Sequence, residues 1–177
     1  MFTINKTSTS GAQLSAKAVL TPDDFRAIAT QAGSAPFVAR KSGLIAARTA
    51  TATERVDTHW NGKESTNTAK PGDRVVTSLD KTGKPLIDAD GHKNIYVILA
   101  DKFVALYELA NVASTLGPTY RARGTVEAIH FPAGFDIIAP WGETQRAPSG
   151  YLILNGQDVY GNNAETFEAS YEREMAR

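Results

Sequence analysis

The sequence predicts an α+β fold built from two tandem copies of a small strand-rich unit. Two stretches carry this prediction, Ala69–Thr77 and Ala147–Leu154, because each joins a proline turn to an apolar run with β-branched residues. A short helical pattern that ends in Tyr-Glu follows each stretch, at Tyr107-Glu108 and at Tyr171-Glu172. We therefore expect about four antiparallel strands and one C-terminal helix in each unit.

The order of these landmarks sets the expected domain boundaries. We expect three consecutive segments: residues 1–35 as a polar tail with an extra helix, residues 36–117 as the first unit, and residues 118–177 as the second unit. Residues 1–15 are rich in Ser and Thr, so they should hold little secondary structure. The extra helix should follow the capping residue Thr21 and stop at Gly33. Because neither unit is large, the two should pack into one compact globule.

Hydrophobic periodicity predicts the elements of the first unit. Apolar and polar residues alternate most clearly in Glu54–Trp60, as in a half-buried strand. The spacing of Phe103, Leu106, Tyr107 and Ala110 is that of one buried helix face. The expected elements are strands at 37–41, 43–48, 54–60, 74–79 and 94–99 and a helix at 100–110.

The second unit is expected to repeat the first, with the same landmarks in the same order. The matched stretches are Phe37–Lys41 with Tyr120–Gly124, Trp60 with Trp141, Pro71–Thr77 with Pro148–Leu154, and Ala100–Glu108 with Ala164–Glu172. The first unit carries an additional excursion at 79–93, and repeats commonly differ in such loops.

Composition narrows the class of protein. The 19 basic and 19 acidic residues give a formal net charge of +0, so neither a nucleic-acid partner nor a basic binding stripe is expected. The sequence has no cysteine, which fits a reducing compartment, and no apolar stretch of the roughly 20 residues that a membrane span needs. We therefore expect a cytoplasmic protein that does not bind membranes.

The first unit resembles the PGDYG family of small bacterial and phage proteins. The residues that carry the resemblance are Gly62, Pro71-Gly72-Asp73, Val75-Val76, Tyr96, Phe103 and Tyr107-Glu108. Arg74 stands where the family has Tyr, whereas the downstream copy restores the aromatic residue as Tyr151. The resemblance implies a bacterial or phage origin and carries no catalytic residue with it. From its own chemistry, Asp73 is expected to bind turn amides in a structural role.

Two tryptophans and nearby arginines form the candidate ligand site. Trp60 and Trp141 lie beside Gly turns, where an indole could act as a stacking platform for a ligand. Arg40, Arg123 or Arg146 would then bind an anionic group of that ligand. The alternative is that each tryptophan is the large aromatic side chain of its own small core.

Carboxylate and imidazole pairs are the candidates for metal binding or catalysis. Asp57 and His59 project from the same face of a predicted strand, although this face could simply be solvated. The stretch Asp88–His92 is expected to be a plain Asp/Gly turn, since it lacks the further oxygen ligands of a calcium loop. His130 precedes Phe131-Pro132 and is expected to be structural. No cofactor is expected.

These observations favour a non-enzymatic binding or interaction module over an enzyme. The sequence has no phosphate-binding glycine loop, dinucleotide fingerprint or nucleophile elbow. The alternative is a small metal-dependent or hydrolytic enzyme that uses Asp57, His59 and His130. The partner is expected to be a protein or a small molecule, and a homo-oligomer is left open.

Overall fold

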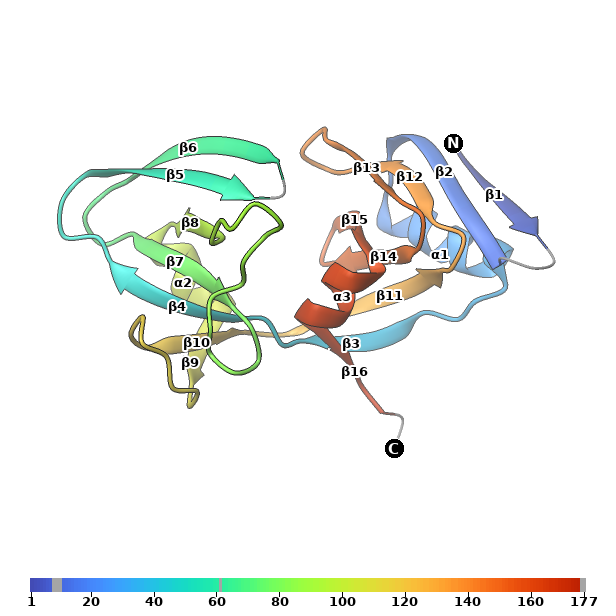
Figure 1. The fold of residues 1–177 in the computed structure, drawn as a ribbon. Helices are drawn as coiled ribbons and strands as arrows, with labels where there is room; N and C mark the ends of the chain where they lie inside the picture. The colour runs from blue at the N-terminus through green and yellow to red at the C-terminus, as the bar shows by residue number, and fades with distance from the viewer. Residues whose placement is uncertain (8–10, 61, 176–177) are drawn as a thin grey trace. The chain divides into compact units, whose positions relative to one another are not determined.

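The protein is rich in β-structure. The computed structural model describes residues 1–7, 11–60 and 62–175 (Figure 1). Strands account for 53% of these described residues, and three helices account for 15%. The expected α+β class, with tandem units that each carry strands and a C-terminal helix, is therefore wrong.

Contacts within the chain define two compact units. Unit 1 consists of Met1–Arg40 and Thr125–Arg177, and unit 2 consists of Lys41–Gly124. These units are not the consecutive segments 36–117 and 118–177 expected from the sequence. The reason is that the two expected copies exchange a strand: β3 (Phe37–Lys41) pairs within unit 1, and β10 (Thr119–Ala122) pairs within unit 2.

Among its described residues, unit 1 contains two sheets and two helices. The four-stranded sheet has the order β1 (Phe2–Thr7), β2 (Gly11–Val19), β12 (Phe135–Ile138), β13 (Thr144–Ala147). The five-stranded sheet has the order β15 (Asp158–Asn163), β14 (Gly150–Asn155), β11 (Thr125–Phe131), β3 (Phe37–Lys41), β16 (Tyr171–Arg173). The helices are α1 (Pro22–Ala32) and α3 (Ala164–Ser170).

The start of the chain is a β-hairpin. Strands β1 and β2 pair antiparallel, and β2 also pairs in parallel with β12. Leu14 is fully buried, and Ala16 is almost so. The expectation of a tail with little secondary structure is thus wrong for the described residues. The polar composition gave no strand signal because only one face of β2 is buried. In addition, β12, with which β2 pairs in parallel, lies far along the sequence.

Helix α1 begins and ends as the sequence predicts. Thr21 accepts a hydrogen bond from the backbone N–H of Asp24, whose carboxylate accepts one from the backbone N–H of Thr21 in return. This capping box satisfies backbone donors that the helix itself leaves unpaired. Gly33 ends the helix with a φ of 67°, a left-handed conformation that glycine adopts without strain.

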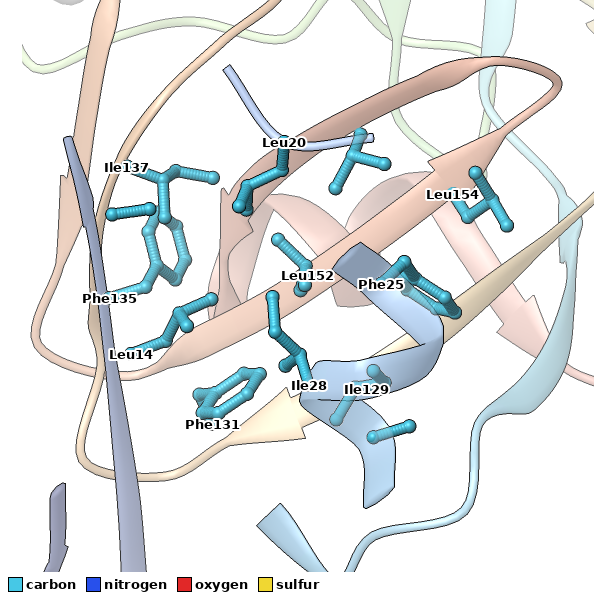
Figure 2. Packing of buried hydrophobic residues seen from close by; sticks show 13 residues of the cluster. Leu14, Leu20, Phe25, Ile28, Ile129, Phe131, Phe135, Ile137, Leu152 and Leu154 are labelled. Carbon is cyan, nitrogen blue, oxygen red and sulfur yellow. The ribbon is translucent and has the colours of Figure 1, made fainter. Parts of the chain in front are cut away.

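The five-stranded sheet of unit 1 is covered on both faces. On one face, α1 and strands β2 and β12 enclose the main core, and Figure 2 shows their side chains pointing toward those of β11 and β14. Ile129 and Leu152 belong to this core. Val126 and Ile153, of opposite parity on the same two strands, pack with Phe167 of α3 in a second cluster. Because successive side chains of a strand point to opposite faces of the sheet, β11 and β14 contribute residues to both clusters.

Unit 2 is built around a sheet with the same organisation. Its strand order is β8 (Ile95–Ile98), β7 (Arg74–Leu79), β4 (Leu44–Thr49), β10 (Thr119–Ala122), β9 (Tyr107–Ala110). Helix α2 (Ala100–Leu106) packs on one face through Phe103, beside Ile45 and Val76. Val56 and Ala69, from the hairpin β5 (Glu54–Trp60) and β6 (Lys63–Ala69), pack with Val75 in a separate cluster.

The two five-stranded sheets correspond strand for strand, with one exchange. In each unit an edge strand leads into a short helix and then into the opposite edge strand: β8, α2 and β9, or β15, α3 and β16. However, β3 pairs with β11 of unit 1, although β4 of unit 2 follows it directly in the sequence. Likewise β10 pairs with β4, although it leads into β11. The chain therefore passes between units at 40–41 and at 124–125.

Both short helices end sooner than the sequence predicts. The predicted helix at 100–110 stops at Leu106, and Tyr107 is already extended with φ of −131° and ψ of 151°. Tyr171 takes the same role after α3. Each Tyr-Glu pair thus begins a strand, because the backbone from Tyr107 onward pairs with β10 instead of continuing the helix.

Candidate functional site

The Pro71-Gly72-Asp73 turn supports the start of helix α2. Gly72 has a φ of 94°, and the Asp73 N–H donates to the Lys70 carbonyl at 3.0 Å, as in a type II turn. The Asp73 carboxylate accepts hydrogen bonds from the backbone N–H groups of Lys70 at 2.9 Å and Ala100 at 3.2 Å. Asp73 is 8% exposed. It therefore acts as a remote cap for a helix whose own N-cap residue is Leu99.

The two tryptophans differ in their surroundings. Trp60 ends β5 and is half-buried. Trp141 lies in the turn between β12 and β13 and is 58% exposed. Its Nε1–H donates to Glu143 Oε2 at 3.0 Å, and its ring centroid lies 5.8 Å from that of Tyr160. The indole of Trp141 is thus held in place with much of its surface accessible.

The arginines expected beside the tryptophans have other partners. Arg123 donates from Nε to the Tyr107 carbonyl at 2.9 Å, and its backbone N–H donates to the Leu106 carbonyl at 2.8 Å. It therefore holds the junction between α2 and β9. Arg40 lies 3.9 Å from Glu172 in an exposed ion pair. A cross-strand ion pair on the Trp141 hairpin instead joins Arg146 to Asp136 at 3.0 Å.

Asp57 is engaged within the β5–β6 hairpin. Its Oδ1 accepts hydrogen bonds from Arg55 Nε at 2.8 Å and from Thr66 Oγ1 at 2.7 Å. These two donors, Arg55 foremost, lower the pKa of the Asp57 carboxyl below its ordinary value. The carboxylate therefore accepts hydrogen bonds from a charged arginine on its own strand and from a neutral hydroxyl on the neighbouring strand.

His59 instead meets His92, in an arrangement that sequence reasoning missed. The two rings are stacked, with centroids 5.3 Å apart and planes at 28°. His59 Nδ1 lies 3.2 Å from Glu64 Oε1, and His92 Nδ1 lies 3.3 Å from Asp88 Oδ2. The available signal was that the strand at 54–60 and the turn at 88–92 each carry a histidine and acidic residues, but the sequence could not show that the two histidines meet.

His130 belongs to a column of aromatic rings in unit 1. Its ring stacks on Tyr151 at 4.6 Å, Tyr151 stacks on Phe167 at 4.0 Å, and Phe167 stacks on Tyr171 at 4.8 Å. Burial, followed by the nearby Glu168 carboxylate, raises the pKa of the Tyr151 phenol. His130 thus lies in a different unit from Asp57 and His59, and these three residues do not assemble within either unit.

Two shallow depressions lie on the four-stranded sheet of unit 1. Their volumes are about 290 and 300 Å³. They share Asp136 and Arg146, and they are otherwise lined by Gln13, Ser15, Ala16, Lys17, Phe135, Ile138, Thr144, Ala147 and Pro148. Sequence reasoning missed the contribution of residues 13–17 because it treated them as part of a polar tail. The depressions present groups of both charges, and the hairpin that supplies Asp136 and Arg146 also carries Trp141 in its turn.

Comparisons with protein-family models, curated proteins and solved structures found no match for the chain. The resemblance to the PGDYG family stays a prediction. In the part of the chain that the structure describes, no helix has the length and apolar character needed to cross a membrane.

Proposed function

We propose that the protein is a non-enzymatic binding module that recognises a protein partner through the surface around Trp141. The observation that carries this proposal is the 58% exposure of an indole that Glu143 and Tyr160 already hold in place. A side chain with a fixed orientation loses little conformational entropy on binding. Tryptophan is also among the residues that contribute most to the affinity of protein interfaces.

The neighbouring surface supports a protein ligand. The hairpin that carries Trp141 also carries Asp136 and Arg146, and β2 adds Gln13 and Lys17. A hairpin that presents an exposed aromatic ring together with polar groups of both charges has the composition of a protein–protein contact. Because the depressions are shallow, they suit an extended segment of a partner better than an enclosed small molecule. The lack of cysteine and the family resemblance support a cytoplasmic setting and a bacterial or phage origin.

A selection from a random peptide display library tests the proposal without requiring the partner to be identified first. The full chain serves as bait, and the enriched peptides are then measured against Trp141→Ala and against Trp60→Ala as the matched control. We expect Trp141→Ala to weaken binding by about 30-fold or more, as for a central interface residue. Trp60→Ala should bind like the wild type.

Fluorescence adds a second readout at the same position. In Trp60→Phe, Trp141 is the only indole, so a bound peptide should change its emission in a saturable manner. The proposal fails if the library yields no enriched peptide, or if the enriched peptides bind Trp141→Ala as tightly as the wild type. Circular dichroism of each variant would distinguish lost binding from lost structure.

A further inference from the structure

Two of the three histidines in the sequence form a pair in unit 2. His59 comes from β5, whereas His92 comes from the loop between β7 and β8, and their ring centroids lie 5.3 Å apart. The side chains are 43% and 48% exposed. The rings can therefore turn without disturbing a hydrophobic core.

A carboxylate contacts the same nitrogen of each ring. Glu64 Oε1 lies 3.2 Å from Nδ1 of His59, and Asp88 Oδ2 lies 3.3 Å from Nδ1 of His92. A carboxylate at Nδ1 favours the tautomer with the proton on that atom, which leaves the Nε2 lone pair available to a metal. Metal-binding histidines in proteins commonly have such a carboxylate at the second nitrogen.

The loop that carries His92 adds further oxygen donors. One ligand atom from each of Asp88, Asp90 and His92 lies within 4.8 Å of the other two. The side chain of Asp88 is only 1% exposed, and its Oδ1 accepts hydrogen bonds from the backbone N–H groups of Asp90 at 3.0 Å and His92 at 2.8 Å. Asp88 thus fixes the loop, while the exposed Asp90 carboxylate can serve as a ligand.

We propose that His92 binds one divalent transition-metal ion of the Zn²⁺ type together with His59, whose ring stacks on that of His92, and with Asp90, whose carboxylate lies within 4.8 Å of a ring nitrogen of His92. Asp88 and Glu64 would orient the two imidazoles. Two imidazoles and a carboxylate are a donor set that suits Zn²⁺, Cu²⁺ or Ni²⁺, whereas Ca²⁺ requires about six to eight oxygen ligands. A bound ion would require both ring nitrogens to approach it to roughly 2.0–2.1 Å. It would join the β5–β6 hairpin to the β7–β8 loop.

Calorimetric titration of the chelator-treated full chain with Zn²⁺ tests the site. The wild type should bind one ion per chain, and the midpoint of thermal unfolding should rise with Zn²⁺ concentration because the ion binds the folded state. His59→Ala and His92→Ala should each lose at least tenfold in affinity. His130→Ala removes the remaining histidine, which lies in unit 1, and should bind like the wild type. Asp88→Asn should weaken binding by about 10- to 100-fold through the orientation of His92.

Imidazole NMR signals of the wild-type chain provide a readout that does not depend on variants. Zn²⁺ should shift the signals of His59 and His92 and leave those of His130 unchanged. The proposal is overturned if no saturable binding occurs up to millimolar Zn²⁺, if His130→Ala removes binding, or if His59→Ala and His92→Ala bind as the wild type does.

Discussion

At the scale of single residues, Asp73 shows how a short motif serves folding. Its two backbone hydrogen bonds tie the Pro71-Gly72 turn to the first residue of α2. In unit 1 the corresponding turn is Pro148-Ser149-Gly150, which has no aspartate, and the start of α3 is held differently. The Asn163 side chain accepts a hydrogen bond from the backbone N–H of Thr166, and the Ala164 N–H donates to the Ser149 carbonyl. The two turns therefore perform the same task with different chemistry.

We predict that Asp73→Ala lowers the free energy of unfolding by about 1–3 kcal/mol, because two backbone N–H groups near a buried position lose their acceptor. Urea unfolding measures the change. Asp101→Ala, an exposed change in the first turn of α2, is the control and should change stability by less than about 0.5 kcal/mol. Equal destabilisation by the two variants would contradict the capping role of Asp73.

Gly161 is required for close packing against Phe135. A Cβ atom at Gly161 would lie 2.5 Å from the Phe135 ring, which is itself 3% exposed. Gly161→Ala should therefore cost about 1–3 kcal/mol through overpacking, as shown by thermal or urea unfolding. Gly43→Ala is the matched control, because an added Cβ there meets nothing within 4 Å among the described atoms. A Gly161→Ala protein as stable as the control would refute this packing argument.

At the scale of elements, the short helices depend on aromatic contacts. Helices of seven residues are too short to persist alone, so α2 and α3 must be held by packing. Phe167 of α3 stacks on Tyr151 at 4.0 Å. At the corresponding position in unit 2, the Arg74 guanidinium lies 4.9 Å from the Phe103 ring centre of α2. A cation–π contact in unit 2 thus replaces the aromatic stack of unit 1.

Helix α1 is also held by charge. Arg26 of α1 donates to both carboxylate oxygens of Glu127 on β11, at 2.7 and 2.6 Å. The hydrogen bonds from Arg26 lower the pKa of the Glu127 carboxyl below its ordinary value of 4.5. Because the folded-state pKa is depressed, the stabilisation is present above about pH 4.5 and is lost as pH falls through the lower folded-state value.

We predict that Glu127→Gln reduces the stability difference between pH 7 and pH 3, because the variant no longer has this titrating carboxyl. Arg26→Gln should have the same effect, since it removes the cause of the lowered pKa. Chemical unfolding at the two pH values measures both. The salt bridge has no part in the acid response if both variants lose as much stability on acidification as the wild type.

At the scale of the whole molecule, strand exchange defines the folding units. The continuous segment 41–124 contains all five strands of the β8-β7-β4-β10-β9 sheet, the β5–β6 hairpin and α2. The segment 36–117, expected from the sequence to be a unit, lacks β10, which lies between β4 and β9. Without β10, both neighbours would expose backbone groups that are paired in the intact sheet.

We predict that an excised 41–124 fragment folds cooperatively, whereas a 36–117 fragment does not. Circular dichroism and thermal unfolding measure this difference, and the signal dispersion in NMR spectra checks for fixed tertiary packing. The reverse result, with 36–117 folded and 41–124 unfolded, would show that the exchange of β3 and β10 is not the organising feature of the chain.

The sequence by itself determined features that depend on a few neighbouring residues. These include both ends of α1, the Pro71-Gly72 turn with its structural Asp73, and the positions of most strands, because capping, turn geometry and alternation are local properties. Trp141 and His59 were named as candidate residues from the sequence, but their surroundings were not predicted. His92 was expected to lie in a plain Asp/Gly turn.

Only the tertiary structure decided which strands pair and which side chains meet. The hydrogen-bonding groups of a strand are backbone atoms common to all residues except proline, so a local pattern does not name its partner. For this reason the sequence could not predict that β2 lies beside β12. It also could not predict that β3 pairs with β11 and β10 with β4. The same long-range pairing brings His59 to His92 and leaves Trp141 exposed, and both proposals rest on these outcomes.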